Sequence, residues 1–176
     1  MVKPNPQQLI QLNQLRDLVI EVMRDMPIWL NTELSYLKNI KLGLLKKNAT
    51  QRHGATKWKV GTAADKMEIK DVDVIELHPE LLNVKWNAYA AFVLHHEYIH
   101  ALGFKNHNNE FRTLENSWPG INAGKHGMEF TEFLRKRSAK WVWRCSKCQK
   151  EFPRKKASLG RYRCRTCSTV LLDIKV

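Results

Sequence analysis

The feature that most constrains the fold is an apolar segment, residues 83–104, with histidines and a glutamate at its centre. Apolar residues would lie on most sides of a helix drawn through this segment, so the sequence predicts a buried helix. The centre reads His96-Glu97-Tyr98-Ile99-His100, which is the pattern HExxH. Histidines four residues apart lie one helical turn apart on one face, where both imidazoles can reach a single metal ion. Because buried polar groups without partners are costly, we expect a metal ion to bind here.

The metal expected at this helix is a catalytic zinc ion, with Glu97 as the catalytic residue. A catalytic zinc site has three protein ligands and an open position for water, and the glutamate after the first histidine can act on that water. Two downstream histidines, His107 and His126, can supply the third ligand. Each begins a similar local pattern, His-Asn-Asn-Glu-Phe or His-Gly-Met-Glu-Phe, and the spacing alone leaves both open. His95 is expected to face away from the metal, either packed inside the protein or supporting a ligand without touching the metal itself.

The last quarter of the chain contains two pairs of cysteines, Cys145 with Cys148 and Cys164 with Cys167. Two CxxC turns separated by 15 residues have the spacing of a zinc ribbon, in which four thiolates close a tetrahedral site. Such a site is structural, and a module this small needs its metal in order to fold. The sequence therefore predicts a second, structural zinc ion. Disulfides are the alternative, and the absence of a visible secretory signal disfavours them.

The formal net charge of +13 is concentrated in the same region. Residues 131–176 contain 14 Lys and Arg against 3 acidic residues, whereas residues 1–130 contain 16 against 14. A basic segment of this kind predicts an anionic partner, most often nucleic acid. The basic residues expected to contact it are Lys147, Lys150, Arg154, Lys155, Lys156, Arg161, Arg163 and Arg165. The interleaved aromatic residues, which can stack on bases or form the core of the ribbon, are Trp141, Trp143, Phe152 and Tyr162.

The remaining patterns predict an α+β fold in which helices pack on a small sheet. Apolar residues at helical spacing predict helices over residues 7–26, 29–40, 83–104, 108–116 and 128–140. Alternating apolar residues predict strands through Trp58, Val60 and Thr62 and over residues 72–77, after a loop at 46–56. We expect a domain boundary near Lys140, which gives domains of residues 1–140 and 141–176.

Three segments together resemble the SprT/Spartan family of zinc metalloproteases. They are HHEYIHALGF (95–104), KHGMEF (125–130) and WRCSKC (143–148), followed by the second CxxC. The resemblance runs from about Trp58 to the C-terminus. It implies a zincin-like minimal metalloprotease domain followed by a zinc ribbon, with His126 as the third catalytic ligand. The segment that begins at His107 instead resembles the third-ligand segment of the related WLM proteases, so His107 remains the alternative.

The resemblance also implies a function. We expect a zinc-dependent endopeptidase that cleaves proteins bound or crosslinked to DNA, as part of repair. Cleavage is expected to be stimulated by single- or double-stranded DNA that binds without sequence preference. The alternatives are a non-catalytic zinc-containing nucleic-acid-binding protein and a zinc hydrolase for a non-peptide bond, and RNA also remains open as the partner.

The chain shows no segment suited to a membrane. Its longest uncharged apolar run, residues 88–94, is too short to cross a bilayer. We therefore expect no membrane partner and an intracellular location. That location is the cytoplasm or nucleoid, or the nucleus in a eukaryote.

Overall fold

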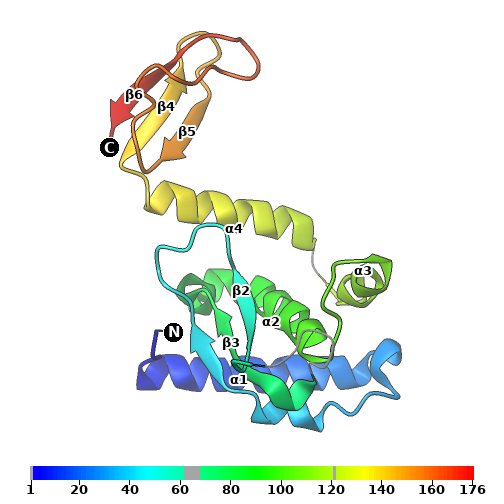
Figure 1. Cartoon of the computed structure of the whole chain (residues 1–176). Helices are drawn as coiled ribbons and strands as arrows, with labels where there is room; N and C mark the ends of the chain where they lie inside the picture. Colours follow the sequence, from blue (N-terminus) through cyan, green and yellow to red (C-terminus); the bar gives the residue numbers. More distant parts are fainter. Residues whose placement is uncertain (1, 62–67, 121) are drawn as a thin grey trace. The chain divides into compact units, whose positions relative to one another are not determined.

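The computed structural model describes residues 2–61, 68–120 and 122–176 (Figure 1). The fold is α+β, with the helices α1 (Pro6–Asp25), α2 (Asn87–Ala101), α3 (Asn109–Asn116) and α4 (Ala123–Arg137). The chain divides into two compact units, Met1–His126 and Gly127–Val176. Each unit contains a three-stranded sheet. None of the described helices has the length and hydropathy of a membrane span.

Helix α1 begins at a capping box and buries one stripe. The Asn5 side chain accepts a hydrogen bond from the backbone N–H of Gln8, whose own side chain accepts from the backbone N–H of Asn5. Such reciprocal capping satisfies two backbone donors that a helix start otherwise leaves unpaired. The buried residues of the helix are Leu12, Val19, Ile20 and Met23. Helix α1 packs against α2 and contacts the sheet at β1 (Leu42–Leu44).

The sheet of the first unit has the strand order β1-β3-β2 (Figure 1). The central strand β3 (Val72–Leu77) matches the predicted strand and pairs in parallel with β1. On its other side β3 pairs antiparallel with β2 (Gly54–Trp58), with Thr56 opposite Ile75. The predicted alternation through Trp58 and Val60 is thus displaced, since β2 ends at Trp58 and Val60 is fully exposed. Thr62 lies outside the described residues.

The predicted helix over residues 29–40 is wrong. The chain there forms two short 3-10 helices, Pro27–Trp29 and Ser35–Asn39, and then enters β1. Parallel pairing of β1 with β3 is a contact between residues about thirty positions apart, which no local periodicity reports.

Helix α2 is the buried helix that the sequence predicts. It contacts α1, α3 and strands β2 and β3, and most of its residues are buried. His95 is fully buried and its ring lies 4.8 Å from the ring of Trp118 and 6.1 Å from that of Trp29. The expectation that His95 packs inside the protein is confirmed.

The second unit contains most of α4 and a small antiparallel sheet. The strands β4 (Trp141–Cys145), β5 (Glu151–Arg154) and β6 (Leu171–Lys175) lie in the order β5-β4-β6. A small core between them consists of Trp143, Cys145, Cys164 and Leu171. The boundary expected near Lys140 falls where β4 begins, whereas the division into compact units falls inside α4.

Candidate metal centre and catalytic cleft

Three histidines of the first unit converge on one point. His96 and His100 project from the same face of α2, and His107 follows the turn that ends the helix. One nitrogen of each ring lies within 4.8 Å of the others, and Nε2 of His100 lies 3.1 Å from Nε2 of His107. The turn uses Gly103 at φ +104°, a left-handed conformation that glycine adopts without a steric penalty. The reversal at Gly103 therefore returns the chain to the helix and brings His107 to the pair.

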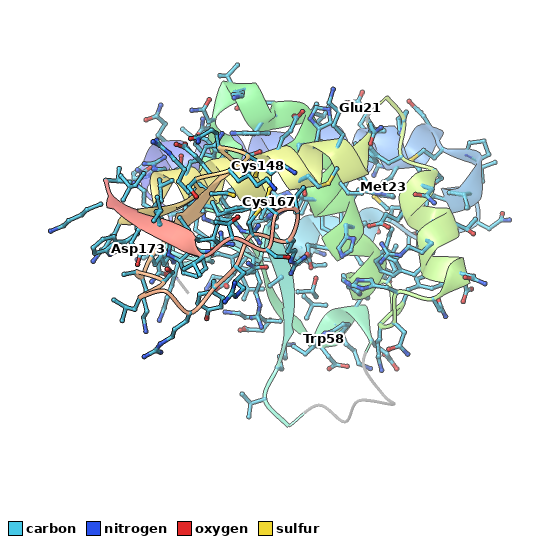
Figure 2. The ribbon with its side chains drawn as sticks, turned by 90° about the horizontal axis from the view of Figure 1, so that it is seen from above. Glu21, Met23, Trp58, Cys148, Cys167 and Asp173 are labelled. Atoms are coloured by element: carbon cyan, nitrogen blue, oxygen red, sulfur yellow. The ribbon has the colours of Figure 1, made fainter. Side chains whose placement is uncertain are left out.

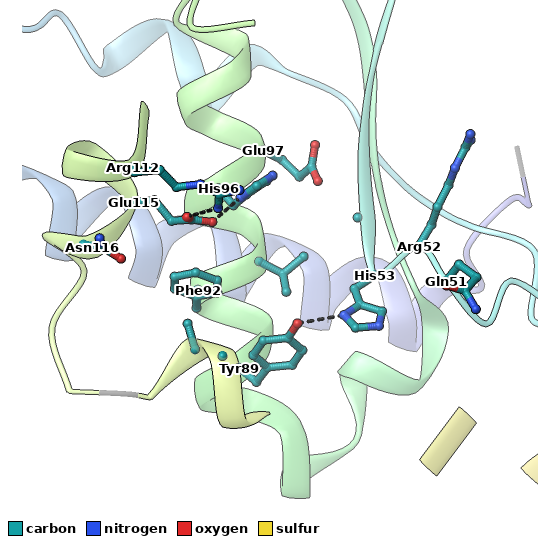
Figure 3. A pocket seen from close by; sticks show the side chains of 14 residues that line it. Gln51, Arg52, His53, Tyr89, Phe92, His96, Glu97, Arg112, Glu115 and Asn116 are labelled. Carbon is teal, nitrogen blue, oxygen red and sulfur yellow. Dashed lines mark hydrogen bonds and ion pairs between the residues drawn. The ribbon is translucent and has the colours of Figure 1, made fainter. Parts of the chain in front are cut away.

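Hydrogen bonds to the far side of two rings orient them toward this point. Nδ1 of His96 lies 2.7 Å from Oε1 of Glu115, and Nδ1 of His100 lies 2.8 Å from the carbonyl oxygen of Phe104 (Figure 3 shows the first). Because both partners are acceptors, each Nδ1 carries the proton and each Nε2 presents a lone pair. This arrangement of ring and acceptor is typical of metal-binding histidines.

Glu115 is itself held in its ionised form. Arg112 donates to Oε2 of Glu115 at 2.5 Å, so the carboxylate bridges the guanidinium and His96. Burial raises the pKa of Glu115, but the hydrogen bonds from His96 and Arg112 outweigh burial and lower this pKa to about 2. A fixed carboxylate of this kind makes the attached imidazole a stronger ligand.

The imidazoles of His100 and His107 are neutral at physiological pH. Burial, with smaller contributions from the neighbouring histidines, lowers the pKa of His100 to about 4. Burial also lowers the pKa of His107. Only the neutral imidazole has a lone pair for a metal, so these residues fit a bound transition metal without a prior loss of protons.

His126, which the family resemblance implies as the third ligand, is not part of this cluster. Its ring lies against Tyr89, with the ring centroids 6.3 Å apart. Tyr89 precedes His96 by two helical turns, or about 10 Å along α2 at the usual rise per residue. The placement therefore favours His107, the alternative that the spacing leaves open.

Glu97 lies beside the histidine cluster and is 5% exposed. The Thr56 hydroxyl of β2 lies 2.8 Å from Oε2 of Glu97 and 3.0 Å from its backbone carbonyl oxygen. Burial raises the pKa of Glu97, while the neighbouring His96 and the hydrogen bonds from Thr56 oppose the increase. A buried carboxylate with a raised pKa has the properties of a general base.

Two cavities meet at Glu97. One has a volume of about 540 Å³ and extends toward Tyr89 (Figure 3), and the other has a volume of about 460 Å³ and extends along β2 toward Trp58 and His107. Both are lined by Gly54, His96 and Glu97. The cluster thus lies in a cleft that continues on both sides of it.

Gly54 lets β2 approach helix α2 at this point. A Cβ atom built on Gly54 would lie 2.6 Å from Oε1 of Glu97 and 2.9 Å from Cγ1 of Val93. Both distances are shorter than side chains tolerate, so any residue other than glycine must displace Glu97.

Replacing Gly54 with alanine is accordingly expected to lower hydrolytic activity by about 100-fold, because a catalytic group moved by about 1 Å loses that much. The metal content should stay unchanged, since the atoms nearest to the added Cβ belong to Glu97 and Val93 and not to a histidine. Turnover and metal analysis of Gly54→Ala test this, and a variant with the parental rate would show that Glu97 does not act from its observed position.

Replacing Glu115 with alanine is expected to weaken metal binding at the histidine cluster by about 10- to 100-fold, the usual effect of losing such a partner. Competition with a chelator measures the affinity. Glu110→Ala on the same helix is the matched control, because Glu110 is exposed and lies outside the cluster. Equal affinities of the two variants would contradict the role assigned to Glu115.

The four cysteines form a second metal-binding group. Their sulfur atoms all lie within 4.8 Å of one another, and Figure 2 shows Cys148 beside Cys167. The residues that follow each CxxC, Gln149 and Ser168, have φ values of 58° and 54°, and their backbone N–H groups donate to the carbonyls of Cys145 and Cys164. The two turns are thus alike in geometry. The cluster can hold one metal ion, in agreement with the predicted site.

Hydrogen bonds shift the pKa values of Cys145 and Cys167 in opposite directions. The N–H of Cys148 is the main cause that lowers the pKa of Cys145 to about 6. Hydrogen bonding with Cys148, followed by burial, raises the pKa of Cys167 to about 12. Four thiolates this close repel one another, and a bound cation removes that repulsion.

The basic residues of the second unit are mainly at its surface. Seven of the eight predicted nucleic-acid contacts are exposed, and the eighth, Arg154, is half-buried with its guanidinium 4.9 Å from the ring centroid of Trp143. Trp143 is buried in the small core, whereas Tyr162, which stacks on it, is 52% exposed. Trp143 therefore belongs to the core of this unit, whereas much of the Tyr162 ring is accessible to solvent.

Several functional residues of the first unit do not stand out in the sequence. For Glu115 a signal exists, because it shares one helical stripe with the buried Phe111 and Leu114, and a carboxylate on a buried stripe needs a partner. Gly54 and Thr56 carry no local signal of a role at Glu97, since they meet it only through the fold.

Comparison with known proteins gives no relative for this chain: no protein-family model, curated protein or solved structure matches it.

Proposed function

We propose that this chain is a zinc-dependent endopeptidase of the SprT/Spartan kind, with a zincin-like domain, and that it acts on DNA-associated proteins. The observation that carries the proposal is the joining of three convergent imidazoles to a buried carboxylate in a cleft open on both sides. Three imidazoles alone would suit a structural metal, and a buried carboxylate alone would suit an internal hydrogen bond. Together they supply a metal site, a general base and room for a polypeptide.

The chemistry follows from the residues at the site. A zinc ion held by His96, His100 and His107 would supply a Lewis acid that polarises the scissile carbonyl and makes water more acidic. Glu97 accepts a proton from the attacking water at a carboxylate oxygen and delivers it to the nitrogen of the leaving amine. Thr56 holds Oε2 of Glu97 in place, so the carboxylate does not have to be ordered during the reaction.

Strand β2 supports a peptide as the substrate. It borders the cleft through Gly54, Ala55, Thr56 and Trp58. In the described part of the chain its ladder partner is β3, on one edge only. An extended peptide can add to such an edge through main-chain hydrogen bonds, which depend little on its sequence. Because the cleft continues past Glu97 in both directions, it suits a bond inside a chain.

The second unit supports DNA as the accompanying partner. Its exposed lysines and arginines can neutralise phosphates, and Tyr162 can stack on a base. Three of the four acidic residues there have partners within the unit. Glu132 pairs with Lys136, Glu151 pairs with Arg144, and Asp173 accepts from the backbone N–H groups of Ser158 and Leu159. Binding of DNA by this unit would raise the local concentration of substrates bound to the same DNA.

The test uses the full chain loaded with zinc and a basic DNA-binding protein as substrate. We expect cleavage that needs zinc and increases when single- or double-stranded DNA is added. The increase should fall steeply between 50 and 200 mM salt, where phosphate contacts weaken by about 10³-fold or more for several contacts. Absence of cleavage under every DNA condition, with two zinc ions bound per chain, would overturn the proposal.

A further inference from the structure

The larger of the two cavities has a floor that belongs to the same helix face as the metal ligands. Tyr89, Phe92, Val93 and His96 line it, and these positions of α2 follow the i, i+3, i+4, i+7 spacing of one helical face. We call this cavity the tyrosine pocket (Figure 3). Because its floor ends at His96, a group bound in this pocket lies directly beside the histidine cluster.

The floor of the tyrosine pocket is formed mainly by two largely buried aromatic rings. The rings of Tyr89 and Phe92 are nearly parallel, with an interplanar angle of 14° and centroids 6.1 Å apart. The Tyr89 hydroxyl lies 2.7 Å from Nδ1 of His53, which anchors the ring to the segment that enters β2 (Figure 3). Burial lowers the pKa of His53 to about 4 and raises that of Tyr89 to about 12. Both groups are therefore neutral at pH 7, and a hydrogen bond between neutral groups holds the Tyr89 ring.

The opposite wall leaves the space open. It is formed in part by Ala123 and Gly124 at the start of α4, where side chains are small. A Cβ atom built on Gly124 would have the Asn122 side chain, at 3.8 Å, as its only neighbour within 4 Å among the described residues. A cavity of about 540 Å³ lies within the range of pockets that bind small organic groups.

The aromatic floor of the tyrosine pocket disfavours a charged occupant. Two arginines and two glutamates line the cavity, namely Arg52, which is exposed, Arg112, Glu97 and Glu115. Arg112 is paired with Glu115, which also binds His96, so neither is available without breaking the support of a metal ligand. A charged lysine or glutamate side chain on the floor would lose its hydration against a surface of aromatic rings, and this desolvation costs free energy. An aromatic side chain instead stacks favourably on such rings.

We propose that the tyrosine pocket binds an aromatic side chain of the substrate, from the residue next to the scissile bond, and so sets the cleavage preference of the enzyme. The inference rests on the proposed endopeptidase function, because it deepens the description of the same cleft. It assigns Tyr89 and Phe92 as specificity-determining residues. A metal ion held by the histidine cluster would fix where the peptide bond lies, and the tyrosine pocket selects the neighbouring side chain.

The first test measures binding without hydrolysis. Two short peptide hydroxamates, identical except for phenylalanine or alanine beside the metal-binding group, are titrated into zinc-loaded full chain. We expect the phenylalanine compound to bind at least about 10-fold more tightly, as apolar pockets discriminate side chains of different size. Gly124→Phe, which fills the pocket from the opposite wall, should abolish the difference, whereas Gly124→Ala should retain most of it. Equal binding of the two compounds by the parental protein would overturn the inference.

The second test measures cleavage of two quenched peptides that differ in the same way. The ratio of kcat/KM for the phenylalanine and alanine peptides should match the ratio of hydroxamate affinities. Cleavage with a ratio near one, or a preference for a glutamate peptide directed by the exposed Arg52, would reject the pocket assignment while the peptidase proposal stands. Tight, phenylalanine-selective hydroxamate binding without any cleavage would reject the peptidase and support the pocket.

Discussion

Replacing His107 with alanine is expected to remove the metal from the histidine cluster and to abolish hydrolysis, whereas His126→Ala is expected to retain both. Loss of a residue that supports a ligand lowers metal affinity by about 10- to 100-fold, and loss of a direct ligand should lower it further. His107 is exposed, so its removal leaves no cavity and should not unfold the chain. Its Nε2 lies 3.1 Å from that of His100, whereas His126 lies against Tyr89.

Metal analysis decides between the two histidines because the cysteine cluster provides an internal standard. The parental chain should contain two zinc ions, one in each cluster, and His126→Ala should also contain two. His107→Ala should contain one, with the ribbon still folded. If His126→Ala contained one zinc ion and His107→Ala two, the family-based expectation for His126 would be correct.

The different outcomes for His107 and His126 show where spacing stops being informative. His96 and His100 are four residues apart within one helix, so the helix geometry alone brings them together. The path from His100 to His107 depends on a left-handed turn at Gly103 and on the carbonyl of Phe104, which accepts from His100. Neither feature produces a periodic pattern in the sequence. The sequence therefore predicts two ligands and leaves the third to the fold.

The same distinction applies to the strands. Residues 72–77 alternate and are correctly predicted, because the central strand of the sheet is buried and strongly apolar. Strand β1 has only three residues, and β2 begins with Gly54 and Ala55, which favour strands weakly. Both strands form because β3 and α2 provide partners. Elements held by tertiary contacts rather than by propensity are the ones that the sequence does not reveal.

The cysteine cluster could be predicted for the opposite reason. Each CxxC closes a local turn, so the positions of two sulfur atoms depend on five residues, and only the meeting of the turns needs the fold. The sheet of β4, β5 and β6 then brings the turns together. The roles of the aromatic residues needed the structure, since Trp143 and Tyr162 look alike in sequence and differ in burial.

Replacing Glu97 with glutamine is expected to lower kcat/KM by about 10²- to 10⁴-fold, the usual contribution of a general base, while both zinc ions stay bound. Glutamine has nearly the same shape and can still accept a hydrogen bond from Thr56, but it cannot take a proton from water. Activity and metal content are measured on the same preparation. Retained cleavage by a clean Glu97→Gln preparation would refute the catalytic assignment.

The matched control is Glu76→Gln, which removes a similarly buried carboxylate from strand β3. Glu76 is 2% exposed on β3, lies 2.7 Å from the ammonium of Lys57, and is not among the residues that line the two cavities. Its loss is expected to lower the melting temperature and to leave kcat/KM unchanged. For Glu97 the reverse holds: glutamine keeps the shape of the side chain and its hydrogen bond with Thr56, so the melting temperature should stay close to the parental value while kcat/KM falls. Opposite changes of activity and stability in the two variants would separate a catalytic carboxylate from a structural one.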